Sequence, residues 1–283
     1  RDCRRSPRGF CDLCVNPTDS DPDTLRRILS RLHHLGYETV AINQTVDESI
    51  FDNEKKKKKK SQDSEIVKIA VPEPIDVTNI KAEFAKKLNI LSRITFTFGD
   101  TSKVHTLGQS HTLKKYDLYA VVPKTQAAFQ FACSQLNADI VTLKSSNLGL
   151  KFTRKLYLQA VERGLHFEIQ YSDVVRQSTR KYALHYSHLF HIFGKSKNVV
   201  VSSGATNETL LRNPYDVINL ASLFGLCEVK AKASVLSQCK HLLLKAEGRR
   251  YGKGVFSIRT NRKTVSEKEN QTDDCTSPKR IKL

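Results

Sequence analysis

Basic side chains beside the expected strand ends and helix starts are the residues whose type and position point most clearly to chemistry. They are Arg93, Lys124, Arg163, Arg176, Arg180 and Arg212. An arginine guanidinium offers a planar fork of N–H donors that matches phosphate oxygens. Tyr171, Tyr182 and Tyr215 could stack on unpaired bases. Each cation alone is typical of an ordinary surface, so only their combination with the net charge indicates that they bind the phosphates of a nucleic acid.

The overall charge favours a polyanionic partner. The chain has 47 Lys and Arg against 29 Asp and Glu, a net charge of +18. This favours nucleic acid over a membrane surface. We find no apolar stretch of about 18 residues that would span a membrane and no apolar secretory segment near the start. Because the sequence contains no Met, we expect the natural N-terminus to lie elsewhere and set residues 1–9 aside.

The cysteines indicate reduced thiols. There are seven, with scattered spacing, and we expect an intracellular protein rather than a disulfide framework. Cys11 and Cys14 form a Cys-x-x-Cys pair, but a zinc ribbon needs a second pair, which the sequence lacks. The pair lies in an expected strand, where a redox-active thiol would lack the helix N-terminus that lowers its pKa. We therefore expect both cysteines to be structural.

Two further constellations permit alternatives. His185, His188 and His191 follow an i, i+3, i+6 spacing, whereas zinc-binding helices use i, i+4. We expect them to form a polar or interfacial helix face. The segment Ser202-Ser203-Gly204-Ala205 follows a valine-rich strand and could either hold phosphate or form an ordinary turn. The sequence has no GxSxG, Walker A or HExxH motif.

Strands and helices are expected to alternate along the chain. Apolar, β-branched runs predict strands at 10–15, 39–42, 90–98, 116–122, 139–143, 165–170, 198–202 and 255–258. Caps and 3.6-residue periodicity predict helices at 21–35, 125–136, 153–163, 174–193, 214–224 and 228–244. This βα alternation is typical of a parallel sheet with helices around it.

The fold class predicted from this order is α/β, with a TIM-barrel-like and perhaps irregular (β/α) barrel. The domain is expected to cover 10–260, and roughly 225 residues excluding the insertion and tails are enough for such a barrel. A doubly wound open sheet is the alternative. That fold usually has a Gly-rich first turn, and residues 16–21 contain no Gly, which disfavours a dinucleotide site.

Two segments are expected to be disordered. Residues 45–68 hold a run of six lysines among flanking acids and read as a solvated, Lys-rich insertion. The tail, 261–283, is polar and aperiodic. It ends with a short basic cluster around Lys279 and Arg280, a pattern typical of nuclear import signals.

Several blocks of the sequence together resemble one known family. They are Leu35-Gly36-Tyr37, Ile90-Leu91-Ser92-Arg93-Ile94-Thr95, Val122-Pro123-Lys124-Thr125, Arg163-Gly164-Leu165, Val200-Val201-Ser202-Ser203 and Pro214-Tyr215-Asp216-Val217. In this order they resemble the TIM-barrel-like thirty-kilodalton protein subunit of ribonuclease P and ribonuclease MRP. The resemblance runs from about Phe10 to Ile258. The first strand departs from the family, since it keeps only one of two acids, Asp12.

The resemblance implies a non-catalytic subunit that binds and organises a catalytic RNA. We expect the phosphates of that RNA to be contacted by Arg93, Lys124, Arg163, Arg176, Arg180 and Arg212. In that family the RNA component and its magnesium remove the 5′ leader from precursor tRNA, so no cofactor is expected on the protein itself. The expected partners are the RNA component, precursor tRNA and other protein subunits, including a small RRM-like one. The expected location is the nucleus and nucleolus, with a further role in rRNA processing through ribonuclease MRP.

Two other functions stay open. One is a metal-dependent phosphoesterase or nuclease of the polymerase-and-histidinol-phosphatase type, using Asp12, Glu168, Asp216 and histidines. Such enzymes need a His-x-His on the first strand, which residues 10–15 do not offer. The other is a scaffold that binds only proteins and whose charge serves solubility.

Overall fold

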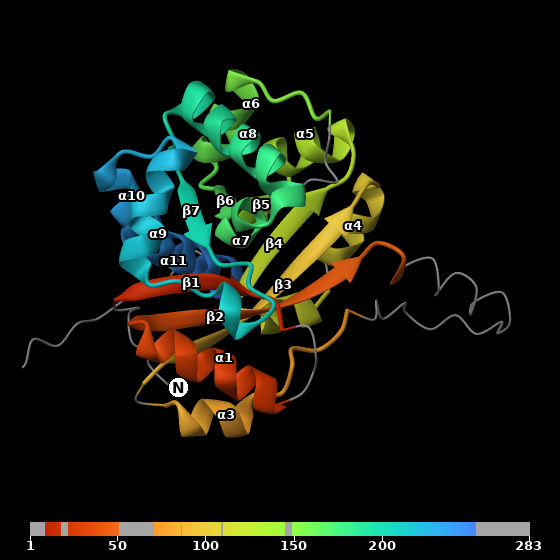
Figure 1. Cartoon of the computed structure of the whole chain (residues 1–283). Coiled ribbons are helices and arrows are strands. Elements are labelled where there is room, and N and C mark those ends of the chain that lie inside the picture. The colour runs from red at the N-terminus through yellow and green to blue at the C-terminus, as the bar shows by residue number, and fades with distance from the viewer. Residues whose placement is uncertain are drawn as a thin grey trace, which may run out of the picture.

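The computed structural model describes residues 9–17, 22–50, 71–85, 87–108, 110–144 and 149–252. Within them the chain forms a seven-stranded parallel sheet whose strands neighbour one another in sequence order (Figure 1). The strands are β1 (Phe10–Val15), β2 (Tyr37–Asp47), β3 (Asn89–Phe98), β4 (Leu118–Pro123), β5 (Ile140–Thr142), β6 (His166–Gln170) and β7 (Val199–Ser202). A doubly wound sheet would instead reverse its strand order near the middle. The predicted barrel is therefore confirmed.

The two edge strands meet just beyond their carboxyl ends, so the barrel is nearly closed. The Gly204 amide donates to the Cys14 carbonyl at 2.8 Å, and the Asn16 amide donates to the Ala205 carbonyl at 2.8 Å. Val15 and Ala205 form a parallel bridge. These bonds join the end of β1 to the segment that follows β7.

Helices surround the strands. They are α1 (Pro22–His34), α3 (Thr78–Glu83), α4 (Thr101–Gly108), α5 (Gln126–Ser134), α6 (Arg154–Glu162), α7 (Tyr171–Val175), α8 (Gln177–Gly194), α9 (Pro214–Leu220), α10 (Glu228–Ser234) and α11 (Ser237–Tyr251). Short 3₁₀ turns are η1 (Thr112–Lys115), η3 (Glu208–Leu210) and η4 (Ala221–Phe224). α3 and α4 were not predicted. None of the described helices has the length and apolar character needed to cross a membrane.

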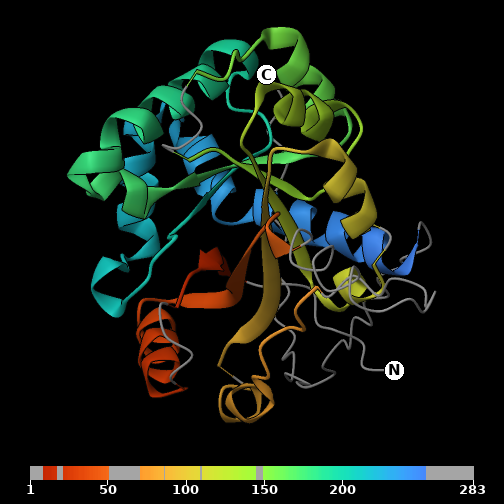
Figure 2. The ribbon, with the colours of Figure 1, turned by 90° about the vertical axis from the view of Figure 1, so that its right-hand side faces the viewer.

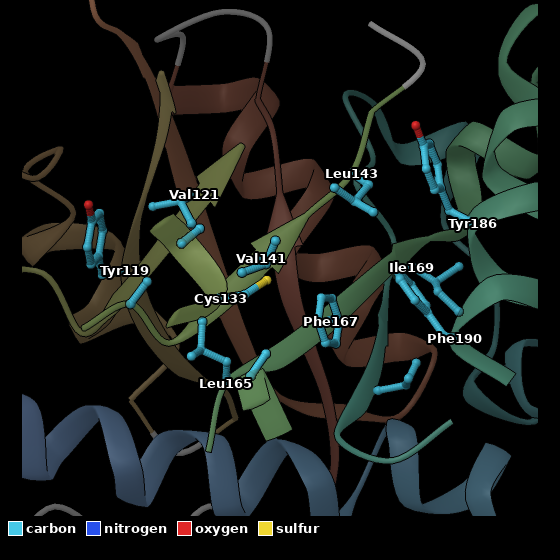
Figure 3. Close-up of a cluster of buried hydrophobic side chains, with 14 of the residues drawn as sticks. Tyr119, Val121, Cys133, Val141, Leu143, Leu165, Phe167, Ile169, Tyr186 and Phe190 are labelled. Carbon is cyan, nitrogen blue, oxygen red and sulfur yellow. The ribbon is translucent and has the colours of Figure 1, made fainter. Parts of the chain in front are cut away.

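Apolar spacing explains how these helices attach. α1 buries Leu25, Ile28, Leu29 and Leu32, which share one helix face, against β2 and α3. On the other side of the barrel, Val141, Phe167 and Ile169 point outward and pack with Tyr186 and Phe190 of α8 (Figure 3).

The prediction of one helix at 174–193 is wrong, because the chain breaks between α7 and α8. Arg176 has φ −71° and ψ 127°, an extended conformation. Side chains from α8 satisfy the carbonyls that the break exposes. Thr179 Oγ1 donates to the Asp173 carbonyl at 2.6 Å, and the Arg180 guanidinium donates to the carbonyls of Val174 and Val175 at 2.8 and 2.9 Å.

The prediction of one helix at 228–244 is also wrong. α10 ends at Ser234, and the Cys11 amide of β1 donates a hydrogen bond to the Val235 carbonyl at 2.9 Å. The chain then turns into α11, which runs across the sheet (Figure 2). Cys239, Leu242, Leu243 and Ala246 of α11 pack with barrel residues such as Leu91, Ile140 and Val200. α11 therefore closes the amino-terminal end of the barrel.

The prediction that 45–47 belong to a disordered insertion is wrong, because β2 extends to Asp47 and pairs with β3 from Thr39 to Asp47. Residues 51–70, the predicted strand 255–258 and the predicted tail 261–283 lie outside the described residues.

Candidate nucleic-acid interface

The inside of the barrel has an apolar layer and a polar layer. Side chains alternate along a strand, so residues two apart share a face. Ala41, Leu91, Ile140 and Val200 form part of the apolar layer beside α11. Two residues further along the same strands stand Asn43, Arg93, Thr142 and Ser202, all buried. The polar layer thus lies toward the carboxyl-terminal ends of the strands, where TIM-barrel enzymes place their active sites.

An ion pair between β3 and β6 occupies the polar layer. Arg93 Nη1 donates to Glu168 Oε1 at 2.5 Å, and Nη2 donates to Oε2 at 2.7 Å. Both side chains are 0% exposed. Glu168 also accepts from Thr142 Oγ1 at 2.6 Å, Ser202 Oγ at 2.8 Å and Gln170 Nε2 at 3.0 Å.

These contacts fix the charge state of Glu168. Burial alone would raise its pKa, but the Arg93 charge and the hydrogen bonds from Arg93, Thr142 and Ser202 outweigh burial and lower the pKa to about 2. A carboxylate saturated by five hydrogen bonds has little capacity left to bind a metal or accept a proton at neutral pH.

Asp12 of β1 has the opposite electrostatic environment. Burial raises the pKa of its carboxyl to about 6, although backbone hydrogen bonds oppose the shift. Oδ1 accepts from the Ser203 amide at 2.9 Å and the Cys14 amide at 3.3 Å. Oδ2 is buried and has no hydrogen-bond partner within the described residues. Asp12 therefore helps to fasten β1 to the segment after β7.

That role decides between the two alternatives for residues 202–205. The Ser203 and Gly204 amides bond to Asp12 and to the Cys14 carbonyl, and the segment is buried. The segment is a turn that closes the barrel, and the phosphate-binding alternative is wrong, because its amides are already engaged.

The residues of the phosphoesterase alternative are not assembled. Asp216 lies exposed in the first turn of α9, whereas Asp12 and Glu168 are buried in the barrel. His188 Nε2 lies 3.0 Å from the Leu223 carbonyl, and the His191 side chain lies beside Gly225. Across the part of the chain that the structure describes, no three His, Cys, Asp or Glu side chains could hold one metal ion.

The prediction that Arg93 contacts RNA is corrected by its burial. Its guanidinium binds Glu168 and the Leu13 carbonyl, the latter at 2.8 Å, and no part of its side chain is exposed. The strand alternates polar Arg93 and Thr95 with apolar Ile94 and Phe96, so the sequence did place Arg93 on a distinct face. In a closed barrel that face points inward.

Three of the other predicted cations donate hydrogen bonds from their guanidinium groups to backbone carbonyls. Arg163 donates to the carbonyls of Cys133, Gln135 and Leu136 at 2.8–3.0 Å, at the carboxyl end of α5. Arg180 caps α7, as described above. Arg212 donates to the carbonyls of Thr209 and Leu211 at 2.8 and 3.0 Å. Arg180 and Arg212 are nevertheless exposed, and Arg163 is half-buried.

The remaining two predicted cations are exposed. Lys124 bonds to Asp47 at 2.7 Å and lies 3.4 Å from Glu48. Arg176 donates to Thr206 Oγ1 at 3.4 Å. Sequence reasoning missed Lys144, which follows β5, bonds to Gln170 and lies 3.3 Å from Asp173. Its position directly after a strand was the available signal.

The positions of these cations relative to the strands show at which end of the barrel each one lies. Lys124, Lys144 and Arg176 follow the carboxyl ends of β4, β5 and β6, and Arg180 lies in the first turn of α8. These four lie toward the carboxyl end of the barrel. Arg212 does not, because its carbonyl accepts a hydrogen bond from Tyr37, the first residue of β2. Arg163 precedes β6 and lies at the opposite end. Cations gathered at the carboxyl end of the barrel, around an interior filled by side chains, are suited to binding a polyanion by its phosphates.

Comparison with known proteins identifies similar chains. The sequence profile of the family described as RNase P subunit p30 matches residues 9–251. The chain is 35% identical over 252 residues to Ribonuclease P protein subunit p30 of Mus musculus, covering 88% of this chain and 90% of that protein. It is 28% identical over 215 residues to Ribonuclease P/MRP protein subunit RPP1 of Saccharomyces cerevisiae, covering 74% and 68%. A chain from a cryo-EM structure of archaeal Ribonuclease P with mature tRNA has the same fold, with a TM-score of 0.57, 16% identity and coverage of 92% and 100%.

Proposed function

The chain belongs to the RNase P subunit p30 family, and on that premise we propose that it is a non-catalytic protein subunit of ribonuclease P. In this role it binds and organises the RNA component, which with bound magnesium removes 5′ leaders from precursor tRNA. The observation that carries the proposal is the family match over residues 9–251, nearly the whole described domain.

The geometry supports a binding role rather than a chemical one. The polar layer of the barrel is filled by the Arg93–Glu168 pair, so the usual location of a barrel active site is occupied by the protein's own side chains. The exposed cations Lys124, Arg176 and Arg180 lie around that end. Phosphate contacts of this kind give an affinity that falls steeply with salt.

We extend the proposal to the assembly around the chain. Its partners are the RNA component, precursor tRNA and other protein subunits, among them a small RRM-like one. Its location is the nucleus and nucleolus, in keeping with the basic sequence around Lys279 and Arg280. The name of the yeast relative supports a second role in ribonuclease MRP and rRNA processing.

Affinity purification tests the proposal. The full chain carries a tag, is expressed in cells of its own source and is isolated from nuclear extract. We expect the eluate to cleave the 5′ leader from a precursor tRNA and to contain a bound RNA. An eluate with protein partners but neither RNA nor cleavage would instead support the protein-only scaffold. Fluorescence imaging of the tagged chain tests the nuclear and nucleolar location.

A further inference from the structure

An open cleft lies on the outer surface between α5 and α6, which run beside each other at the edge of the molecule (Figure 1). Its volume is about 420 Å³. Its lining residues are Gln126, Gln130, Ser134, Lys151, Thr153, Lys155, Leu156 and Gln159. Among the described residues that line the cleft, Leu156 is the only apolar one and none is acidic.

Hydrogen bonds fix the walls of this cleft. The Gln126 side chain pairs with the backbone of Lys151: the Lys151 amide donates to Oε1 at 2.7 Å, and Nε2 donates to the carbonyl at 3.1 Å. Thr153 caps α6 by accepting from the Leu156 amide at 3.4 Å. The Lys151 backbone before α6 is therefore held against α5.

Helical spacing arranges the polar groups in two facing rows. Gln126, Gln130 and Ser134 recur every four residues along α5, and residues so spaced lie on one face. Lys155 and Gln159 form the same spacing on α6. Because a helix rises 1.5 Å per residue, the α5 row spans about 12 Å, comparable to about three or four stacked nucleotides.

We propose that this cleft binds a short stretch of the ribose-phosphate backbone of single-stranded RNA. Lys151 and Lys155 supply ammonium groups for phosphate, and the amino end of α6 adds partial positive charge. Gln130 and Gln159 carry amides that both donate and accept, which matches the 2′-hydroxyl of ribose. The inference rests on the proposed function, since it names a site for RNA that the subunit would bind.

The first test measures salt dependence with the full chain. Labelled uridine RNA and deoxyuridine DNA of the same short length are titrated in about 50–200 mM salt. We expect Lys151→Gln with Lys155→Gln to weaken the binding of both probes and to flatten the slope of log affinity against log salt by about 1.4, because each lost phosphate contact removes about 0.7. Lys81→Gln with Lys87→Gln, on and just after α3 at another face, is the matched control. If the control flattens the slope as much, or if the wild type binds neither probe, the proposal is overturned.

The second test concerns the 2′-hydroxyl. We expect Gln130→Ala with Gln159→Ala to weaken RNA binding and leave DNA binding unchanged, so that the preference for RNA falls. Both positions lie on helices where Ala is well tolerated, so folding is preserved. An unchanged ratio of RNA to DNA affinity overturns the assignment of the glutamines and with it the proposed ligand.

Competition identifies the source of the RNA. Unlabelled precursor tRNA and the RNA component of ribonuclease P are added separately to the bound uridine probe. Displacement by one of these RNAs supports the proposed site and identifies that RNA as its ligand. If neither RNA displaces the probe, the proposal is overturned. These results are independent of tRNA processing: loss of probe binding in the variants, without cleavage in the affinity eluate, would reject the proposed function while supporting the cleft.

Discussion

Arg93 on β3 and Glu168 on β6 bind each other inside the barrel through two hydrogen bonds of 2.5 and 2.7 Å, with neither side chain exposed. The pair joins strands that are separated by two others in the sheet. A planar guanidinium and a carboxylate in this arrangement make a strong, directional contact. Thr142 of β5 and Ser202 of β7 add hydroxyl donors and Gln170 of β6 adds an amide donor, so the hydrogen-bonding capacity of the Glu168 carboxylate is satisfied.

Removing one partner of this pair should strongly destabilise the fold. We expect Arg93→Ala to lower the free energy of unfolding by about 3–5 kcal/mol, because Glu168 would be left buried without a counter-charge. Urea denaturation measures the change. The double variant Arg93→Met, Glu168→Met should lose less than the two single variants added together. Full stability of Arg93→Ala would contradict the buried pair.

Asp12 should make the fold less stable as pH rises. Its folded-state pKa of about 6 lies above the ordinary value of 3.8, so the folded state binds the proton more tightly. The stabilisation is complete below about pH 4 and is lost as pH rises through about 6, amounting to about 3 kcal/mol. We expect Asp12→Asn to abolish this fall when urea denaturation is repeated between these pH values. The same fall in the variant would assign the effect to another group.

His166 should act in the opposite direction over nearly the same range. Burial lowers the pKa of its imidazole from 6.5 to about 4, so its contribution is complete above about pH 6.5 and is lost as pH falls to about 4. We expect that the stability of His166→Gln no longer decreases as pH falls toward 4. The loss of the Asp12 contribution with rising pH then becomes visible on its own. His34→Gln, an exposed position on α1, is the control. Identical pH profiles for His166→Gln and the wild type would refute the assignment.

The exposed cations should separate RNA binding from structural roles. We expect Lys124→Ala with Arg176→Ala to weaken RNA binding and to flatten the slope of log affinity against log salt by about 0.7–0.9 per lost phosphate contact. Arg163→Ala should instead lower stability by about 1–3 kcal/mol with the salt slope unchanged, because its guanidinium serves three backbone carbonyls. A filter-binding salt titration and urea denaturation measure the two effects. The reverse pattern would place the RNA at the other end of the barrel.

Strand positions were predictable from the sequence because a parallel barrel buries β-branched runs such as Val199-Val200-Val201. The inward direction of Arg93 and Glu168 was not. Both alternate with large apolar residues, a pattern equally typical of a polar face toward solvent. Only closure of the sheet turns that face inward, and closure depends on contacts between β1 and residues 203–205, far apart in sequence.

The helix breaks were hidden for a related reason. Apolar periodicity continues across Arg176 and across Val235, and neither break contains Gly or Pro. Each break is stabilised by a non-local or side-chain partner, namely Arg180 for α7 and the Cys11 amide for α10. The cleft between α5 and α6 could not be predicted from the sequence, because its two polar rows form one site only when the two helices lie side by side.

The central claim is that RNA, and not this chain, performs the cleavage. The most direct measurement divides the affinity eluate in two, treats one half with a nuclease that is then inactivated, and assays both halves for 5′ cleavage of precursor tRNA beside the purified chain alone. If the RNA performs the cleavage, only the untreated half cleaves the precursor. Cleavage that survives nuclease treatment and is reproduced by the purified chain would contradict it and establish a protein enzyme.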